Sequence, residues 1–413
     1  MKVLVVGAGG RCHAIVDALN KSSRVDKIYC APGNAGIASV ASIVNIKETD
    51  VAALKQFAIK EKIDLTVVGP EMALAAGIVD EFVASGLKIF GPSKKAAEIE
   101  TSKSYAKSLM KKYHIPTASY EVFTDYDKAL DYVKGHSLPI VLKYDGLAAG
   151  KGVVIATTLA EASNTLKDML IDDKFGDSSV VIEDYLEGPE FSFMCFVSND
   201  MIYPMEVSQD HKRAFDHDLG PNTGGMGAYS GVPIITDEDK EYALKNIMEP
   251  TAKALIAEGR PFKGVLYGGL MKTKDGIKVI EFNARFGDPE TEVVLPKLKN
   301  DIFEVFCDII DGNKVELTFD NDYYLGVVLA SKGYPESYEK GFLIEGLQDV
   351  NGLVYHMGTR YSDGKYYTNG GRVLIVVAKG KTLAEAQQNA NHEVEKIKCS
   401  NLYHRTDIGY RSL

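Results

Sequence analysis

The chain has 413 residues, which is enough for several domains with a sizeable buried core. Its composition, 45% hydrophobic and 25% charged, is typical of a soluble globular protein, and no apolar run is long enough to span a membrane. The net charge of −10 falls mainly on residues 102–324, which excludes a nucleic-acid surface because such a surface needs a basic stripe. Small anionic substrates remain compatible with this charge if local Lys, Arg and a metal ion neutralise them.

The beginning of the chain and its cysteines predict a cytoplasmic protein. The first apolar run stops at Gly7 and Arg11 follows, so we expect a buried first strand rather than a signal peptide. Five cysteines are scattered singly without a C-x-x-C pair. This spacing predicts reduced thiols, with neither disulfides nor a zinc site.

The first hundred residues alternate apolar runs with helical patterns. We expect strands at 3–6, 27–31, 64–68 and 87–90, and helices at 14–22 and 51–62. This alternation predicts a doubly wound α/β domain with a parallel sheet over residues 1–101. The Gly-Pro-Ser sequence at 91–93 then opens a new helix, and 103–113 continue the helical period.

A glycine-rich turn at 7–14 joins the first predicted strand to the first helix. Backbone N–H groups and the helix dipole attract an anion at such a turn. Dinucleotide binding needs an acidic residue at the end of the second strand, and residues 30–34 contain none. We therefore favour a phosphorylated small molecule over NAD or a purely structural turn. The residues expected at this site, including one at the same edge of the sheet, are Gly9, Gly10, Arg11 and Glu71.

The rest of the chain divides into two further domains. Residues 102–324 form the predicted central domain, in which a small α/β lid is inserted at about 117–190. Antiparallel strands are expected after the lid, at 191–197, 265–273 and 277–282. Residues 325–413 read as short strands, glycine turns and one late helix at 383–397, which predicts a small C-terminal α+β domain.

Two segments of the lid have the composition of a nucleotide site. Lys143 and Lys151 bracket a loop of small residues whose amides can close over phosphates, but Gly152 stands where a P-loop needs Ser or Thr. The acidic stretch 183–190 follows a buried strand, so its backbone can read an adenine edge and Glu190 can bind ribose hydroxyls. A solvated acidic turn is the alternative for the second segment.

The strand expected at 280–285 places Glu281, Asn283 and Arg285 on one face because side chains alternate along a strand. A carboxylate and an amide oxygen suit Mg²⁺, and a guanidinium fork suits phosphate. Phe282 and Ala284 would pack in a core on the opposite face. A surface strand of mixed polarity is the alternative, which the upstream lysines disfavour.

With these residues in place, the chain resembles the ATP-grasp ligases and, among them, the phosphoribosylamine–glycine ligase (glycinamide ribonucleotide synthetase) family. The segments that carry the resemblance are 141–153, 209–213, 220–229, 281–292, 369–374 and 405–411. The resemblance implies an N-domain, an A-domain with an inserted B-lid, and a C-domain. The chain departs from the family at Cys12, where Glu is usual, and at 267–272, where many ATP-grasp enzymes carry an acidic metal ligand.

The resemblance implies ATP-dependent ligation of glycine to 5-phosphoribosylamine through glycyl phosphate, a step of purine biosynthesis. ATP would be clasped between lid and A-domain with Mg²⁺ or Mn²⁺. The implied nucleotide-binding residues are Lys103, Lys143, Lys151, Gly152, Glu183, Asp184, Tyr185, Leu186 and Glu190, and the implied metal ligands are Glu281 and Asn283.

Catalysis by positioning and charge neutralisation is expected, since no Ser-His-Asp or Cys-His arrangement is apparent. Arg285 and Lys143 would stabilise the transferred phosphoryl group, Asp210 would hold the glycine ammonium, and His211 would assist proton transfer or serve as a structural histidine. The residues expected around the substrates, besides those of the N-terminal turn, are Asp210, Lys212, Pro221, Thr223, Gly224, Arg285, Gly371 and Arg372.

The predicted partners are small molecules only, with neither nucleic acid nor membrane, and the family resemblance implies a monomer. Three alternatives stay open at this point. The first is another ATP-grasp ligase with a different acceptor (including a biotin-dependent carboxylase component). The second is a non-catalytic nucleotide sensor, which the joint presence of the charged residues at the nucleotide site disfavours. The third is an oxidoreductase built on the N-terminal turn, which the missing carboxylate of the second strand disfavours.

Overall fold

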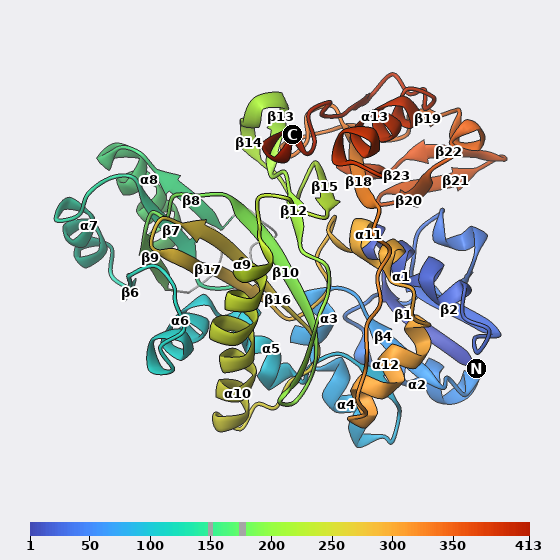
Figure 1. Cartoon of the computed structure of the whole chain (residues 1–413), viewed down its shortest axis with the longest axis horizontal. Coiled ribbons are helices and arrows are strands. Elements are labelled where there is room, and N and C mark those ends of the chain that lie inside the picture. Colours follow the sequence, from blue (N-terminus) through green and yellow to red (C-terminus); the bar gives the residue numbers. More distant parts are fainter. Residues whose placement is uncertain (148–151, 173–178) are drawn as a thin grey trace.

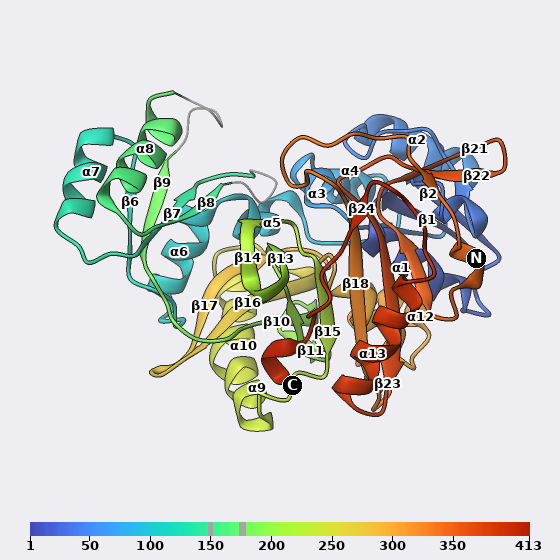
Figure 2. The same cartoon turned by 90° about the horizontal axis from the view of Figure 1, so that it is seen from above.

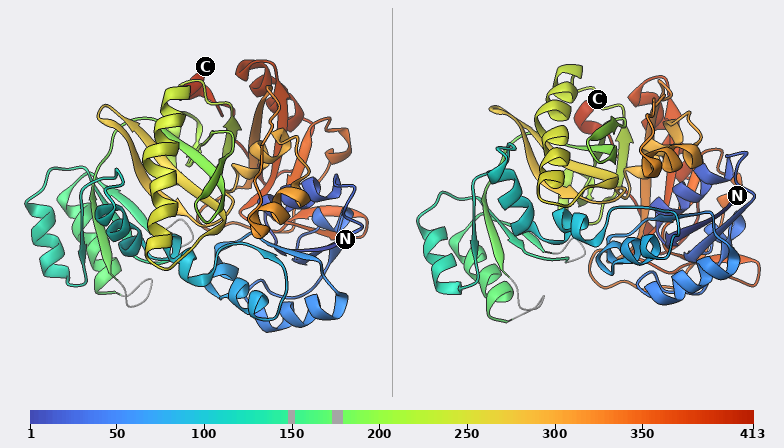
Figure 3. Two further views of the ribbon diagram at one scale, coloured as in Figure 1. Left: turned by 60° about the horizontal axis from the view of Figure 1, so that its bottom comes forward. Right: turned by 90° about the horizontal axis from the view of Figure 1, so that it is seen from below.

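The protein folds into four units arranged around a central sheet (Figure 1). The structure is a computed structural model, and it describes residues 1–147, 152–172 and 179–413. The N-terminal and C-terminal units lie together on one side of the central body, and the lid projects from the other side (Figures 1 and 3). This arrangement confirms the predicted fold class.

The N-terminal unit is a five-stranded parallel sheet in the order β3-β2-β1-β4-β5. Its strands are β1 (Lys2–Gly7), β2 (Lys27–Pro32), β3 (Ser42–Ile43), β4 (Leu65–Val68) and β5 (Ile89–Phe90). Its helices are α1 (Gly10–Asn20), η1 (Ile37–Ser39), α2 (Val51–Glu61), α3 (Glu71–Ala75) and α4 (Ile78–Ala84). The winding reverses between β1 and β4, and the glycine-rich turn lies at the carboxyl end of β1, which is where ligands commonly bind in doubly wound sheets.

Some boundaries in this unit differ from the sequence prediction. Helix α1 begins at Gly10 rather than at residue 14, because its first turn holds residues without an apolar period. The short elements β3, α3 and α4 gave no recognisable pattern. The helix predicted after residue 93 is two helices, α5 (Lys94–Thr101) and α6 (Lys103–Lys112), and Ser102 caps the second by accepting a hydrogen bond from the N–H of Tyr105.

The lid is a four-stranded antiparallel sheet in the order β6-β9-β7-β8. Its strands are β6 (Tyr120–Phe123), β7 (Ile140–Tyr144), β8 (Val153–Ala156) and β9 (Val180–Asp184), and its helices are α7 (Tyr126–Lys134) and α8 (Leu159–Leu170). The two helices pack on the sheet around a core of the lid's own, which includes Leu142, Leu166 and Ile182. The lid therefore has the interior of a small independent unit.

The body and the C-terminal unit share one sheet, in the order β17-β16-β10-β12-β15-β18-β23-β20, with β11 paired to β10 and β24 to β18 (Figure 2). The body strands are β10 (Glu190–Ser198), β11 (Met201–Pro204), β12 (Ser208–Asp210), β15 (Gly227–Ser230), β16 (Lys263–Thr273) and β17 (Gly276–Asn283). The C-terminal strands are β18 (Tyr323–Ser331), β20 (Leu353–His356), β23 (Arg372–Gly380) and β24 (Leu402–Tyr403). The predicted boundary near residue 324 thus falls at the start of a strand that pairs directly with β15 of the body.

Helices and smaller sheets complete these two units. The helices are α9 (Asp237–Ala243), the π-helix η3 (Leu244–Met248), α10 (Glu249–Ala257), α11 (Thr291–Val294), η4 (Leu295–Lys297), α12 (Ile302–Asp311), η5 (Leu347–Asp349), α13 (Leu383–Val394) and η6 (Tyr410–Ser412). A hairpin is formed by β13 (Arg213–Phe215), η2 (Asp216–Asp218) and β14 (Leu219–Asn222), and a three-stranded sheet by β19 (Leu343–Ile344), β21 (Thr359–Ser362) and β22 (Lys365–Thr368).

Two large apolar cores each combine residues of the N-terminal unit, the body and the C-terminal unit. One contains Val6 and Leu374, and the other contains Val5 and Ile375, because neighbouring side chains on β1 and β23 face opposite sides of their sheets. Among the described helices, none combines the length and apolar character needed to cross a bilayer.

Candidate active site

The lid meets the body through one carboxylate that two lysines share. Glu183, at the end of β9, is buried, and its Oε1 lies 2.9 Å from Nζ of Lys143 on β7. Its Oε2 lies 2.9 Å from Nζ of Lys107 on α6. Lys143 also donates to the carbonyl of Ile280 on β17 (2.9 Å), and Lys107 donates to the hydroxyl of Thr117 (2.7 Å). Because a buried charge is costly unless it is paired, these contacts link the lid strands to α6 and β17.

The N-terminal end of α6 faces the loop that follows β7. Nζ of Lys103 donates to the carbonyl of Gly146 (2.9 Å), and the Asp145 carboxylate accepts from the N–H of Ser104 (3.1 Å). Burial lowers the pKa of Lys103, while the nearby Glu281 opposes this shift. A lysine and a helix N-terminus beside the start of a glycine-rich loop form a site that attracts phosphate.

Two predicted residues lie further along this loop. Lys151 lies outside the described residues, and Gly152 is buried just before β8. The predicted adenine-binding stretch lies at the edge of the lid, where Asp184 and Tyr185 are exposed and Leu186 is half-buried. Glu190 begins β10 of the body, so the stretch runs from lid to body.

Glu281 and Asn283 lie at the end of β17 with the buried Phe282 between them, as the predicted alternation requires. Four cations act electrostatically on the Glu281 carboxylate, namely Lys212, Lys143, Lys103 and Arg285. Burial would raise the pKa of Glu281, but these cations outweigh burial and lower it. Among the described residues its carboxylate has neither a hydrogen bond nor an ion pair. An ionised, unpaired carboxylate beside an amide oxygen fits a hard divalent cation.

Arg285 follows β17 and is held by two carboxylates from outside the strand. Its Nε lies 3.3 Å from Oε2 of Glu71 and its Nη2 lies 2.9 Å from Oε1 of Glu100. Glu100, on α5, also accepts the backbone N–H of Ala284 (2.7 Å), so it orients both the chain after β17 and the guanidinium. Nη2 of Arg11 lies 3.3 Å from the same Oε2 of Glu71. One carboxylate therefore brings together a guanidinium of the N-terminal unit and one of the body.

The charge on Glu71 depends on these two arginines. Burial would raise its pKa, but Arg11 and Arg285 lower it to about 2. Glu71 therefore stays ionised at neutral pH and occupies the position between two guanidiniums that an anionic substrate group would also favour.

Asp288 joins the N-terminal turn to the C-terminal unit. Its Oδ1 lies 2.9 Å from Nη2 of Arg372, and its Oδ2 accepts the backbone N–H of Arg11 (3.3 Å). Arg372 also donates to the carbonyl of Gly224 (2.8 Å). Burial opposes ionisation of Asp288, but Arg372 and Arg11 lower its pKa. The predicted residues Arg11 and Arg372 thus meet at one carboxylate. Gly224 joins this group through Arg372, and the neighbouring Gly371 is buried.

The glycine-rich turn is packed too closely for larger residues. A Cβ on Gly10 would lie 2.4 Å from Oε1 of Glu292 on α11, and one on Gly9 would lie 3.3 Å from the Asp288 carboxylate. Cys12 is buried behind the turn, and burial raises the pKa of its thiol to about 12. Packing is therefore the role that the structure favours for Cys12, and the helix start does not activate it.

The acceptor loop (residues 211–226) connects β12 to β15 and contains the β13–β14 hairpin. Asp210 ends β12, and its Oδ1 is buried with no hydrogen-bond donor among the described residues. Burial raises the pKa of Asp210 well above its usual value, and Glu290 adds to this shift. Nζ of Lys212 lies 3.2 Å from Oε2 of Glu190, and the Thr223 hydroxyl donates to the Lys212 carbonyl (2.8 Å). The predicted Pro221 is exposed on β14.

His211 is fully buried, and its surroundings favour the structural alternative over proton transfer to a substrate. Its Nε2 accepts the backbone N–H of Gly409 (3.1 Å), and its ring centroid lies 5.9 Å from those of Tyr229 and Tyr410. Burial, together with the nearby Arg411 and Arg405, lowers the pKa of His211 to about 3.

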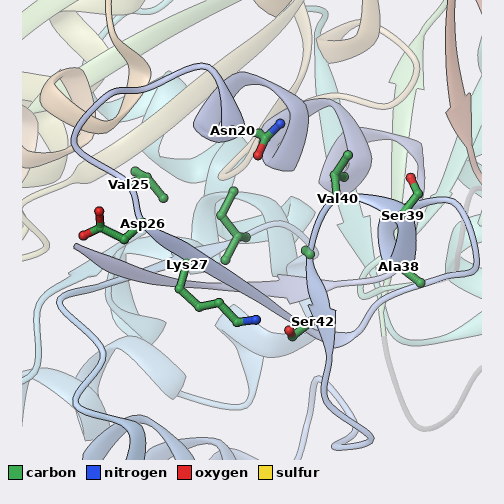
Figure 4. Close-up of a pocket in the computed structure, with 10 residues that line it drawn as sticks. Asn20, Val25, Asp26, Lys27, Ala38, Ser39, Val40 and Ser42 are labelled. Atoms are coloured by element: carbon green, nitrogen blue, oxygen red, sulfur yellow. The ribbon is translucent and has the colours of Figure 1, made fainter.

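The structure thus brings predicted side chains of all four units to one region. A separate surface cavity plays no part in it. That cavity, of about 340 Å³, lies between the end of α1 and β2–β3 of the N-terminal unit (Figure 4). Asn20, Lys27 and Ser42 are among its lining residues, and none of the predicted site residues lines it.

Sequence reasoning missed several charged residues of the region: Glu100, Lys107, Asp288, Glu290 and Glu292. Lys107 stands one helical turn after Lys103, so the i, i+4 spacing was a usable signal. Asp288 and Glu290 belong to the 281–292 segment but received no role. Glu100 lies on a separate helix and gave no local signal, because only the tertiary structure brings it to Arg285.

Lysines and a carboxylate suited to Mg²⁺ lie where the lid meets the body. This arrangement defines an ATP-grasp enzyme. Three models of phosphoribosylglycinamide synthetase match the chain, the N domain over residues 1–100, the ATP-grasp (A) domain over 101–291 and the C domain over 324–411. The chain belongs to the phosphoribosylglycinamide synthetase family.

Curated relatives and solved structures agree with this family. A phosphoribosylamine–glycine ligase of Halalkalibacterium halodurans is 55% identical over 100% of this chain and 97% of that protein. One of Caldanaerobacter subterraneus is 49% identical over 99% of each. A crystal structure of phosphoribosylamine–glycine ligase from Thermotoga maritima has a TM-score of 0.87 and 33% identity, covering 99% of this chain and 100% of that one.

A biotin carboxylase from Campylobacter jejuni has a TM-score of 0.76 at 15% identity, covering 99% of this chain and 94% of that one, and shares the fold alone. The predicted family, fold class and enzyme class are confirmed. The roles of individual residues remain predictions.

Proposed function

We propose that this site joins the carboxylate of glycine to the amine of 5-phosphoribosylamine, with conversion of ATP to ADP and phosphate, in purine biosynthesis. Membership of the family and full-length identity to phosphoribosylamine–glycine ligases support this activity. The observation that carries it is the Glu281 carboxylate near the end of β17, which is unpaired among the described residues and whose pKa is lowered by cations of the lid, the body and the acceptor loop. Such a site suits a metal-bound triphosphate next to an anionic donor.

The nucleotide is expected between lid and body. Lys103 and Lys143 would contact its phosphates, the 183–186 stretch its adenine, and Glu190 its ribose, while the loop with Lys151 and Gly152 would cover the phosphates. Glu281 and Asn283 would hold the divalent ion, for which we expect Mg²⁺ with Mn²⁺ as a substitute. When bound, the ion would neutralise phosphate charge and orient the γ-phosphoryl group.

A carboxylate is a poor electrophile, so the γ-phosphoryl group is expected to move to glycine first and give glycyl phosphate, which the amine then attacks. Arg285 would stabilise the transferred group, and its ion pairs with Glu71 and Glu100 support this role because they orient the guanidinium. Asp210 would receive the glycine ammonium, since its buried Oδ1 has no donor within the described structure and an arriving cation would reverse its raised pKa.

The acceptor is expected where the N-terminal turn, the acceptor loop and the C-terminal unit meet. Gly9, Gly10 and Arg11 would bind its phosphate, with Glu71, Lys212, Pro221, Thr223, Gly224, Gly371 and Arg372 around the ribosylamine. The position of the turn supports this, because Gly9 and Gly10 begin α1 directly after β1, where the helix dipole favours an anion. We expect a cytoplasmic monomer.

The test is ADP release measured with glycine alone, with phosphoribosylamine alone, and with both. Full turnover requires both substrates, and glycinamide ribonucleotide accumulates in step with ADP. ADP release that needs neither substrate, or a different amine acceptor that supports faster turnover, would overturn the assignment. Glu281→Gln tests the metal ligand, since it should raise the Mg²⁺ concentration needed for half-maximal rate by about tenfold or more. Lys27→Ala, beside the remote cavity, is the control and should keep the wild-type requirement.

A further inference from the structure

The last residues of the chain fold back onto the acceptor loop, where Arg405 contacts Asp218 of η2. The hairpin in that loop forms a sheet of only two strands, β13 and β14. Most of its residues are exposed, including Phe215 and Leu219. A two-stranded ribbon is marginally stable alone, so contacts from elsewhere must hold it in place.

The C-terminal segment (residues 405–412) supplies these contacts through Asp218 at the tip of the hairpin. Nη1 of Arg405 lies 2.9 Å from Oδ1 of Asp218, while Nη2 of Arg411 and the Tyr410 hydroxyl both donate to its Oδ2. Arg405 is fully buried and also donates from Nη1 to the carbonyl of Arg213 (3.1 Å). One hairpin carboxylate is therefore held by three side chains of the C-terminal segment.

The tip of the hairpin has a backbone conformation that needs support. His217 and Asp218 have φ values of 60° and 54°, in the left-handed region that residues other than glycine disfavour. The N–H of His217 donates to Asp407 (2.8 Å), and the N–H of Thr406 donates to Asp216 (2.9 Å). The C-terminal segment thus fixes the backbone of the turn as well as its carboxylate.

The same segment also contacts two residues at the predicted glycine pocket directly and a third through Tyr229. Nη1 of Arg411 donates to the carbonyl of Asp210 (3.3 Å), and the N–H of Gly409 donates to Nε2 of His211 (3.1 Å). The Ser412 hydroxyl lies 2.7 Å from that of Tyr229, which in turn donates to Oε1 of Gln209 (2.6 Å). Residues 209–211 are thereby connected to the C-terminus.

We propose that Arg405, Arg411 and Asp218 are positioning residues that set Asp210 and the acceptor loop for glycine binding. This inference rests on the proposed function, in which Asp210 receives the glycine ammonium. Arg411 has the central part because its guanidinium contacts both the hairpin carboxylate and the Asp210 carbonyl. A lysine has one compact ammonium and cannot reproduce this fork.

The test measures kcat and the KM values for glycine, ATP and phosphoribosylamine in the full-length enzyme. Arg411→Ala and Asp218→Asn should raise the KM for glycine by about tenfold or more and leave the KM for ATP within about twofold, because positioning errors act on the ligand that uses the displaced group. Arg411→Lys should recover only part of the loss. Lys396→Ala is the matched control, since it removes an ion pair with Glu393 near the end of α13, away from the hairpin, and should change none of the three KM values.

A merely structural role predicts a different pattern. If the variants lower Tm but leave the KM for glycine unchanged, or raise all three KM values equally, the proposal is overturned. If Asp218→Asn or Arg411→Ala does not fold, Tyr410→Phe decides the question, because it removes one hydrogen bond to Asp218 and should raise the KM for glycine selectively. Wild-type enzyme that fails to couple ADP release to glycine would instead contradict the proposed function, so the two failures are distinguishable.

Discussion

The lid and the C-terminal unit are attached to the body in opposite ways. The lid has its own sheet and its own core, and the buried Glu183 carboxylate links it to Lys107 on α6. The C-terminal unit continues the body's sheet through the pairing of β15 with β18 and shares both large cores. Backbone pairing and shared apolar packing make a fixed joint, whereas a few polar contacts leave a unit able to move as a whole. The difference indicates that the nucleotide side is built to open and the acceptor side is built to stay in place.

The largest effect should come from matched core truncations in the two units. Leu166 of the lid and Leu374 of the C-terminal unit are both fully buried, so replacing either by Ala should cost about 2–5 kcal/mol. Leu166→Ala should lower the Tm of a lid transition and leave the main transition in place, whereas Leu374→Ala should lower the main transition. Differential scanning calorimetry measures both. A single transition that shifts equally in the two variants would contradict the distinction between the joints.

Variants of the two lysines at the lid joint can separate nucleotide binding from structural support. Lys143→Met should lower kcat/KM for ATP by about a hundredfold or more, because it removes a predicted phosphate contact. Lys107→Met is the matched control, since both lysines lie 2.9 Å from Glu183 and only Lys143 also reaches β17. We expect Lys107→Met to lower Tm while kcat/KM for ATP falls by about tenfold or less. Equal losses in the two variants would show that the joint acts as one unit.

A smaller, pH-dependent effect is expected where the N-terminal and C-terminal units meet. The N–H of His356 donates to Nδ1 of His13 (2.8 Å), and burial lowers the pKa of His13 to about 4. The unfolded chain binds a proton at His13 below about pH 6.5 and the folded protein does not, so stability present at pH 7 is lost as pH falls towards 4. Between pH 7 and 5 the loss should be roughly 2 kcal/mol.

The measurement is the Tm of the main transition at pH 7 and pH 5, in wild type and in His13→Gln. The variant should lose less Tm on acidification, because its side chain does not titrate. An identical pH dependence in the two proteins would show that other groups cause the acid sensitivity and that the contact between these units does not.

Local sequence patterns were sufficient to predict strands and candidate site residues wherever the sequence repeats a regular hydrophobic period or contains several motif residues close together. Strands β1 and β4 were predicted because each is a short, mostly apolar run of the kind that is buried in a parallel sheet. Glu281 and Asn283 were predicted on one face of β17 because alternation is a property of any strand. The family resemblance likewise rested on short segments whose order along the chain is specific.

The sequence by itself determined the parallel N-terminal sheet, the family and most of the residues at the candidate site. Only the tertiary structure decided that body and C-terminal unit share one sheet, that Glu183 is held between two lysines, that Glu100 orients Arg285, and that the chain's last residues hold the hairpin at Asp218. The physical reason is the same in each case. These interactions join residues that are far apart along the chain. Neither the hydrophobic period nor the local propensity predicts which distant charged residue a buried side chain will contact.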